Sequence, residues 1–146
     1  MRAFARVSYA KEDVVLPVRK TSGSAGYDFI SPVDHTVFAG DSYVVDTQIK
    51  AYMNPGEVLM LFPRSSYGFK YHMSIANTVG IIDADYADNP DNEGDIMIKV
   101  YNGGNKPLEL KKGEAFCQGI FLPFLITDDD AATESRVGGI GSTTGK

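Results

Sequence analysis

The chain has 146 residues, which is enough for one domain with its own hydrophobic core. Its composition, 43% hydrophobic and 23% charged, is ordinary for a globular protein. The formal net charge of −5 excludes nonspecific nucleic-acid binding through a broad basic face. A small phosphorylated ligand stays compatible with this charge if a divalent cation and a few arginines neutralise it locally.

The single cysteine, Cys117, rules out an intramolecular disulfide. It lies in an apolar run, where we expect a buried structural thiol and not a nucleophile. The first residues contain no long apolar stretch, so we expect neither a signal peptide nor a membrane span. We therefore interpret the protein as cytoplasmic.

Short apolar segments rich in β-branched and aromatic residues predict strands at 43–49, 57–62, 96–101 and 115–122. Between the second and third of these, a short helical turn is predicted at 65–71, just after Pro63. In the 96–101 segment, apolar residues alternate with Lys99 at a period of two. Turn residues separate the segments, and the 7 prolines leave little room for long helices. The pattern predicts an all-β sandwich or barrel, with the jelly roll among the options.

Residues 83–95 carry six carboxylates and first suggest a calcium loop. Counted from Asp83, however, the fifth, sixth and twelfth positions hold Ala, Asp and Gly, where an EF-hand requires Asp or Asn, Gly and Glu. Loose metal coordination stays open, but we interpret Asp88, Asp91 and Glu93 as part of a solvated acidic hairpin.

From Thr127 onward the chain is polar and rich in small residues, so we assign 1–126 to a β domain and 127–146 to a mobile tail. The tail ends in Gly-Lys but is no P-loop, because Ile140 stands where that motif needs its first glycine. Two interpretations stay open: a disordered tail, or a segment that wraps phosphates with Arg136 beside it.

The residues after Pro63 also allow two interpretations. Arg64, Ser65 and Ser66 would open the short helix, and backbone N–H groups with an arginine suit an anion site. Serine N-capping after a proline is the simpler structural alternative.

Five motifs in chain order resemble the trimeric dUTPase family. They lie at 23–29 after Leu16-Pro17, and at 63–66, 77–86, 113–123 and 136–143. One motif alone would be weak evidence, whereas five in register across most of the chain are specific. The resemblance implies a jelly-roll-like subunit, a homotrimer with active sites at subunit interfaces, and Mg²⁺-dependent hydrolysis of dUTP to dUMP and pyrophosphate.

The resemblance also implies residue roles. Asp83 would activate the attacking water, and Tyr86 would exclude a ribose 2′-hydroxyl. Asp28 would organise Mg²⁺ through water, with the ion held mainly by the substrate phosphates. The uracil-binding positions would be Asn77, Gly80, Ile81, Ile82 and Met97. The phosphate-binding positions would be Arg64, Ser65, Ser66 and Gln118, over which Arg136, Ile140, Gly141 and Ser142 of the tail would close.

The chain departs from the family pattern at three places. Ser66 stands where a glycine is usual, and residues 87–93 lengthen the hairpin after the third motif. Ile140 replaces the aromatic residue that stacks on uracil, which removes a contact worth about 1–3 kcal/mol. We expect either a smaller contribution from the tail or a stack supplied by Phe69 or Tyr71.

Two other functions stay open. A dCTP deaminase would share the fold, but that family has His-Arg before the third-motif Ile-Asp and Pro-Gly-Trp after it, unlike the flanks here. A dUTPase-derived regulatory binding protein is the non-enzymatic alternative, suggested by the altered tail and the long acidic segment.

Overall fold

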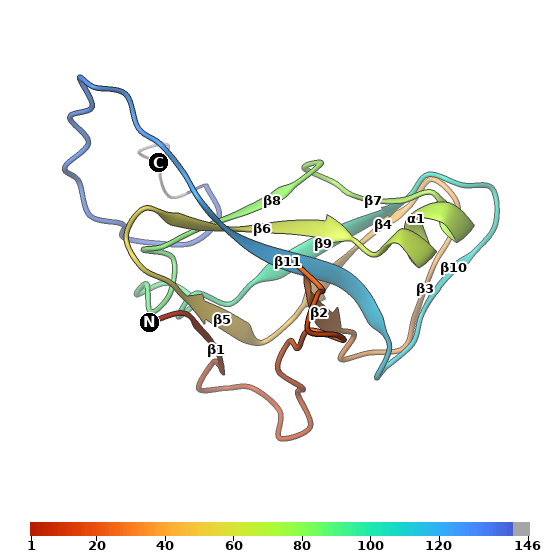
Figure 1. The fold of residues 1–146 in the computed structure, drawn as a ribbon. Helices are drawn as coiled ribbons and strands as arrows, with labels where there is room; N and C mark the ends of the chain where they lie inside the picture. The colour runs from red at the N-terminus through yellow and green to blue at the C-terminus, as the bar shows by residue number, and fades with distance from the viewer. Residues whose placement is uncertain (142–146) are drawn as a thin grey trace.

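The computed structural model describes residues 1–141, which form short strands and one seven-residue helix (Figure 1). In chain order the elements are β1 (Ala3–Arg6), β2 (Tyr27–Ile30), β3 (His35–Val37), β4 (Ser42–Asp46), β5 (Ile49–Tyr52), β6 (Glu57–Pro63), α1 (Ser65–Tyr71), β7 (Met73–Ile75), β8 (Gly80–Asp83), β9 (Met97–Asn102), β10 (Leu108–Leu110) and β11 (Ala115–Pro123).

The strands pair mainly with strands that are distant in the chain. One four-stranded sheet has the order β2-β11-β6-β8, and a three-stranded sheet has the order β4-β9-β7. Two further pairs, β1-β5 and β10-β3, complete the pairing among the described residues, and every pairing is antiparallel. The prediction of an all-β fold is confirmed.

The core forms where the inward faces of the strands meet. In β9, Ile98 and Val100 are buried while Lys99 is exposed, which confirms the predicted period of two. They join Leu59 of β6 and Phe29 of β2 in one buried cluster, and burial of each such side chain contributes about 1.5–3 kcal/mol. Cys117 belongs to the same cluster, and burial raises the pKa of its thiol. The expectation of a structural thiol is confirmed.

Three predicted strands and the helix are confirmed within one or two residues, but the segment 43–49 is not one strand. It divides into β4 and β5 at Thr47 and Gln48, where Gln48 adopts a φ of 60°. The Thr47 hydroxyl donates to the carbonyl of Ile96 (2.7 Å), and the Gln48 N–H donates to Asp95 Oδ1 (2.9 Å). These contacts from a distant part of the chain fix the break, so the local apolar pattern could not reveal it.

The helix α1 is not capped by serine. Its N-cap residue is Arg64, which makes no side-chain capping hydrogen bond, and Ser65 and Ser66 occupy the first turn. The helix ends at His72, whose φ of 53° places it in the left-handed conformation.

The acidic segment is not a hairpin. β8 belongs to the four-stranded sheet and β9 to the three-stranded sheet, so residues 84–96 connect two sheets. Two of its exposed or half-buried carboxylates are also tied to the body: Asp88 accepts from Lys50 Nζ (2.5 Å), and Glu93 accepts from the N–H of Ser8 (2.8 Å). The interpretation as a hairpin is therefore wrong, whereas Asp88 and Asp91 are exposed to solvent as expected.

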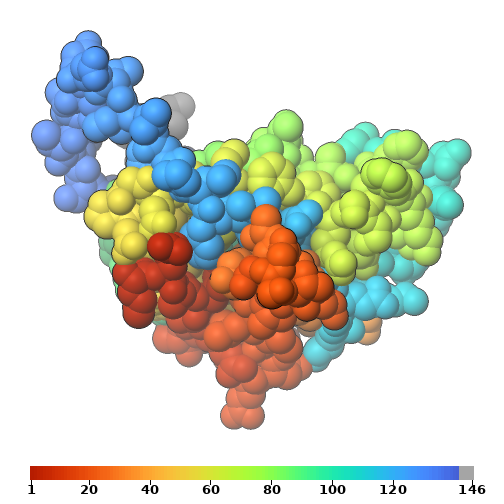
Figure 2. Space-filling view, in the orientation of Figure 1, coloured from red at the N-terminus to blue at the C-terminus, as the bar shows by residue number. Residues whose placement is uncertain are grey.

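After β11 the described chain contains neither strand nor helix. Figure 2 shows it projecting from one corner of the body, and Figure 1 shows it turning back toward the strands. Within residues 1–141, no helix is long and apolar enough to cross a membrane.

Candidate active site

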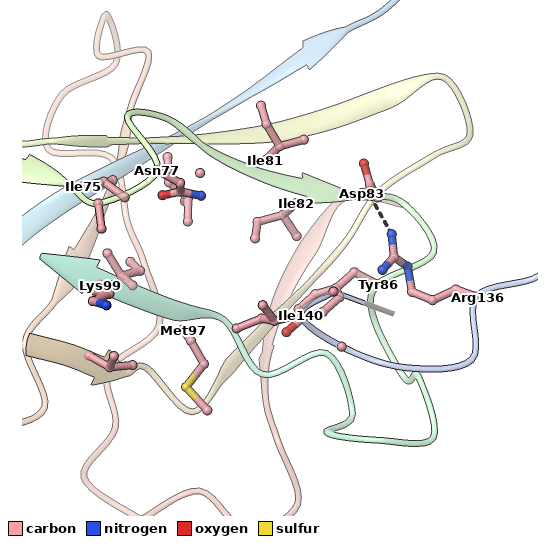
Figure 3. A pocket seen from close by; sticks show the side chains of 17 residues that line it. Ile75, Asn77, Ile81, Ile82, Asp83, Tyr86, Met97, Lys99, Arg136 and Ile140 are labelled. Carbon is pink, nitrogen blue, oxygen red and sulfur yellow. Dashed lines mark hydrogen bonds and ion pairs between the residues drawn. The ribbon is translucent and has the colours of Figure 1, made fainter. Parts of the chain in front are cut away.

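A cavity of about 460 Å³ lies beside β8 and the start of β9 (Figure 3). It gathers nearly all the residues predicted from the third motif and the tail: Asn77, Gly80, Ile81, Ile82, Asp83, Tyr86, Met97, Arg136, Ile140 and Gly141. Ser142, also predicted, lies outside the described residues. The structure thus brings the expected base, sugar and tail positions to one place.

Asp83 ends β8 and faces Arg136 of the tail. Arg136 Nη2 donates to Asp83 Oδ2 at 2.6 Å (Figure 3). Arg136 Nε donates to Asp85 Oδ1 at 2.8 Å. The bond to Asp85 and the charges of both carboxylates raise the pKa of the guanidinium. The Arg136 side chain is 10% exposed, so its ion pair with Asp83, the candidate base, is partly desolvated.

Tyr86 forms a fixed wall of the cavity and is only 8% exposed. Its N–H donates to the carbonyl of Asp83 (3.1 Å), which closes a turn directly after β8. Its hydroxyl donates to the carbonyl of Asp95 (2.7 Å) and accepts from Asn92 Nδ2 (2.9 Å). Burial raises the pKa of the hydroxyl, so Tyr86 is a neutral, immobile ring at neutral pH.

The free edge of β8 offers backbone groups to a ligand in the cavity. β8 is an edge strand, paired on one side with β6, so its outward N–H and C=O groups are available to a ligand. Gly80 allows β8 to pack closely against β6, because a Cβ at this position would lie 2.9 Å from Leu61 Cβ. The backbone groups of such an edge can hydrogen-bond to the polar edge of a base, as the sequence predicts for Ile81 and Ile82.

The uracil-stacking position stays aliphatic. Ile140 lines the cavity but is 83% exposed, and Tyr86 is the one aromatic residue among the described lining. Phe69 and Tyr71, suggested as substitutes, lie on α1 and do not line this cavity. Within one chain that suggestion is wrong, because α1 follows the other end of β6.

The remaining predicted residues line two smaller hollows. Asp28, Arg64, Ser65 and Gln118 surround one of about 260 Å³, and Ser66 lines the adjoining hollow of about 350 Å³. Arg64 Nε lies 3.7 Å from Asp28 Oδ1, and Lys20 is a second cation in the lining of both hollows. A Cβ at Gly26 would lie 2.3 Å from Gln118 Oε1, so only glycine allows this position of Gln118.

Within one chain, these two hollows are separate from the cavity at Asp83. Their described lining residues have no member in common, and Asp28 and Asp83 lie on strands at opposite edges of the four-stranded sheet. Three strand spacings separate them by about 14 Å across the sheet. The two residues are also offset along the strands. Asp28 pairs with Gln118, which pairs with Phe62 of β6, whereas Asp83 pairs with Val58 of β6. The four residues from Val58 to Phe62 correspond to roughly 13 Å along β6.

Several residues outside the cavity support its wall, and the sequence assigned them no role in the site. Asn89, Asn92 and Asp95 hold Tyr86, and Asp91 Oδ2 accepts from the N–H of Gly139 in the tail (3.2 Å). In the sequence these residues resemble ordinary turn formers, and the run Asn-Pro-Asp-Asn carries no chemical signature.

Residues 12–144 match the model of a protein family described as dUTPase. The chain is 40% identical over 137 residues to the deoxyuridine 5'-triphosphate nucleotidohydrolase of Lactococcus lactis, covering 92% of this chain and 91% of that protein. It is 35% identical over 136 residues to the protein of the same name from Chromobacterium violaceum, covering 88% and 87%.

Solved structures show the same similarity. The crystal structure of a dUTPase from Streptococcus mutans is 41% identical with a TM-score of 0.78, covering 86% of this chain and 98% of that one. The dUTPase of Staphylococcus bacteriophage 80alpha superposes with a TM-score of 0.74 at 19% identity, covering 92% and 97%, which is a likeness of fold.

Proposed function

This chain belongs to the dUTPase family and hydrolyses dUTP, and we propose that Asp83 activates the water that attacks the α-phosphorus. The observation that carries the proposal is the position of Asp83 at the rim of the cavity, one turn from the fixed ring of Tyr86. A carboxylate within hydrogen-bond reach of water accepts its proton as the water oxygen bonds to the α-phosphorus. In the same step the bond from the α-phosphorus to the bridging oxygen breaks, and this oxygen leaves with the pyrophosphate. The products are then dUMP and pyrophosphate.

Tyr86 and β8 select the nucleoside. The immobile ring of Tyr86 leaves no space for a 2′-hydroxyl, which favours a deoxyribose. The outward backbone groups of Ile81 and Ile82, with Asn77 and Met97 beside them, pair with the uracil edge. A buried backbone group left unpaired by a wrong base costs about 1–3 kcal/mol, which supplies the discrimination.

The phosphates require a second subunit. Arg64, Ser65, Ser66 and Gln118 lie too far from Asp83 in one chain to contact the same α-phosphate, so we place them on a neighbouring copy. From the family resemblance we propose that three copies assemble. Exposed apolar side chains at the end of β11 and beyond it, with Leu125 97% exposed, support association through this segment.

The donor set fits Mg²⁺ held mainly by the substrate. Among residues 1–141, no three His, Cys, Asp or Glu side chains gather around one point, and Asp28 is the one carboxylate lining the hollow with Arg64 and Gln118. Mg²⁺ usually keeps several waters and binds through phosphates and few carboxylates, so Asp28 would hold it through water. When bound, the ion neutralises charge on the departing pyrophosphate.

Arg136 links the tail to the chemistry. Its guanidinium pairs with Asp83, and the triphosphate offers it more negative charge. Its transfer to the phosphates frees the Asp83 carboxylate for water and carries Ile140 and Gly141 over the substrate. Closure in this manner excludes bulk water and aligns the α-phosphorus.

The test compares two neighbouring carboxylates that both bind Arg136. Asp83→Asn should lower pyrophosphate release by about 10²–10⁴-fold, as expected for loss of a general base, while dUTP binding stays measurable. Asp85→Asn is the matched control and should retain most of the activity. Cleavage by Asp83→Asn at the wild-type rate would refute the assignment. Ammonia release from dCTP would instead identify the deaminase alternative, and a wild type that binds dUTP without cleaving it would favour the regulatory one.

A further inference from the structure

Tyr86 is held at both ends by the loop that follows it. Asn89 Nδ2 donates to the backbone carbonyl of Tyr86 at 2.7 Å. At the other end, Asn92 Nδ2 donates to the Tyr86 hydroxyl at 2.9 Å, and that hydroxyl donates to the carbonyl of Asp95 at 2.7 Å. The phenol thus has one donor and one acceptor partner, which fixes both its position and the direction of its proton.

The loop that supplies these contacts is itself closely tied. Asn92 Oδ1 accepts from Asn89 Nδ2 (2.8 Å) and from the N–H of Gly94 (3.0 Å). Asn89 Oδ1 accepts from the N–H groups of Asp91 (3.0 Å) and Asn92 (3.2 Å). Gly94 has a φ of 88°, and a Cβ there would lie 2.6 Å from Ala87 Cα. These contacts tie the loop together and link it to the Tyr86 backbone and hydroxyl.

Burial increases the importance of these contacts. Asn89 and Tyr86 are buried, and Asp95 is 0% exposed, so water does not replace a lost partner freely. The segment 87–93 is one of the three places where the chain departs from the family pattern. Through Asn89 and Asn92 it contacts Tyr86, the residue assigned to the sugar position.

We propose that Asn92 is a positioning residue that sets the selectivity for deoxyribose by fixing the Tyr86 hydroxyl. It does not touch the substrate; it holds the ring that does. With the hydroxyl released on one side, the ring tilts and admits a 2′-hydroxyl more easily. This inference rests on the proposed function, in which Tyr86 lies under the deoxyribose.

The experiment measures kcat/KM for dUTP and for UTP with the full-length protein. Asn92→Ala should lower the ratio of the two by about three- to tenfold, the range expected for one neutral hydrogen bond. Asn92→Asp provides a second variant that keeps the Oδ1 acceptor for Asn89 and Gly94 and loses the N–H donor, so it should lower the ratio with less effect on Tm. Asn105→Ala, in an exposed turn away from the cavity, is the matched control and should leave the ratio unchanged.

A double-mutant cycle separates positioning from general stability. In a Tyr86→Phe background there is no hydroxyl to hold, so Asn92→Ala should change the ratio no further. An equal loss in both backgrounds, or an unchanged ratio in both Asn92 variants, would overturn the inference and leave the proposed function standing. A wild type that fails to cleave dUTP would overturn the proposed function, and the inference with it.

Discussion

Asp95 predicts a measurable dependence of stability on pH. Its carboxyl group is 0% exposed, and burial, followed by the neighbouring Asp46 carboxylate, raises its pKa from the ordinary 3.8 to about 7. It accepts hydrogen bonds from the Tyr9 hydroxyl (2.9 Å) and the N–H of Gln48 (2.9 Å), which lower the pKa but do not offset burial. The folded protein therefore favours the protonated form.

The sign follows from proton binding. Between pH 3.8 and about 7 the unfolded chain has lost this proton while the folded chain keeps it, so the free energy of unfolding falls as pH rises through this range. At about 1.4 kcal/mol per pH unit, the loss at neutral pH and above is at most about 4 kcal/mol. Below pH 3.8 both states are protonated and the full stability is present.

Asp95→Asn tests this reasoning, because an amide resembles the protonated acid and does not ionise. The variant should match wild type near pH 4 and exceed it in free energy of unfolding by up to about 4 kcal/mol at pH 8. Urea denaturation of both proteins at several pH values measures the difference. Asp129→Asn, on the exposed tail, is the control and should give a small, flat difference. A difference for Asp95→Asn that does not change with pH, or that grows as pH falls, would show that the carboxyl group is not protonated in the folded protein.

Two predictions concern the tail. Gly139→Ala should raise the KM for dUTP severalfold with little change in Tm. The added Cβ would lie 3.0 Å from Asn92 Nδ2 and 3.1 Å from Asp91 Oδ2, so it would displace the tail. Steady-state kinetics measure the KM, and an unchanged value would argue against docking of the tail at this loop. Ile140→Phe should tighten binding of a nonhydrolysable dUTP analogue by supplying a stacking ring, worth up to about 1–3 kcal/mol in calorimetry. Ile140→Val is its control, and equal affinities for Phe and Ile would show that this side chain does not cover the base.

The sequence alone determined the elements whose signals are local. The alternation of apolar and polar residues in 96–101 predicted β9, and Pro63 correctly predicted that a helix, α1, begins shortly after it. The motifs predicted that Asp83, Tyr86 and Asn77 share a site, and one cavity contains all three. These residues lie within ten positions of one another, so β8 and its adjoining turns bring them together without help from distant segments.

The tertiary structure decided what depends on remote partners. The break at Gln48 needs Asp95, and the course of the acidic segment needs Lys50 and Ser8, each more than thirty residues away. No local pattern encodes such a contact, because a turn residue gives the same signal whether its side chain faces water or another strand.

The same reason explains the site as a whole. The motifs predicted Asp28 and Asp83 as parts of one function, but the order of strands in the sheet places them at opposite edges. That order follows from which strands pair, and pairing depends on burial across the entire core. The sequence predicted which residues carry the chemistry. The sheet places these predicted residues in two separate parts of one chain, and the loop after β8 brings Asn89 and Asn92 into contact with Tyr86.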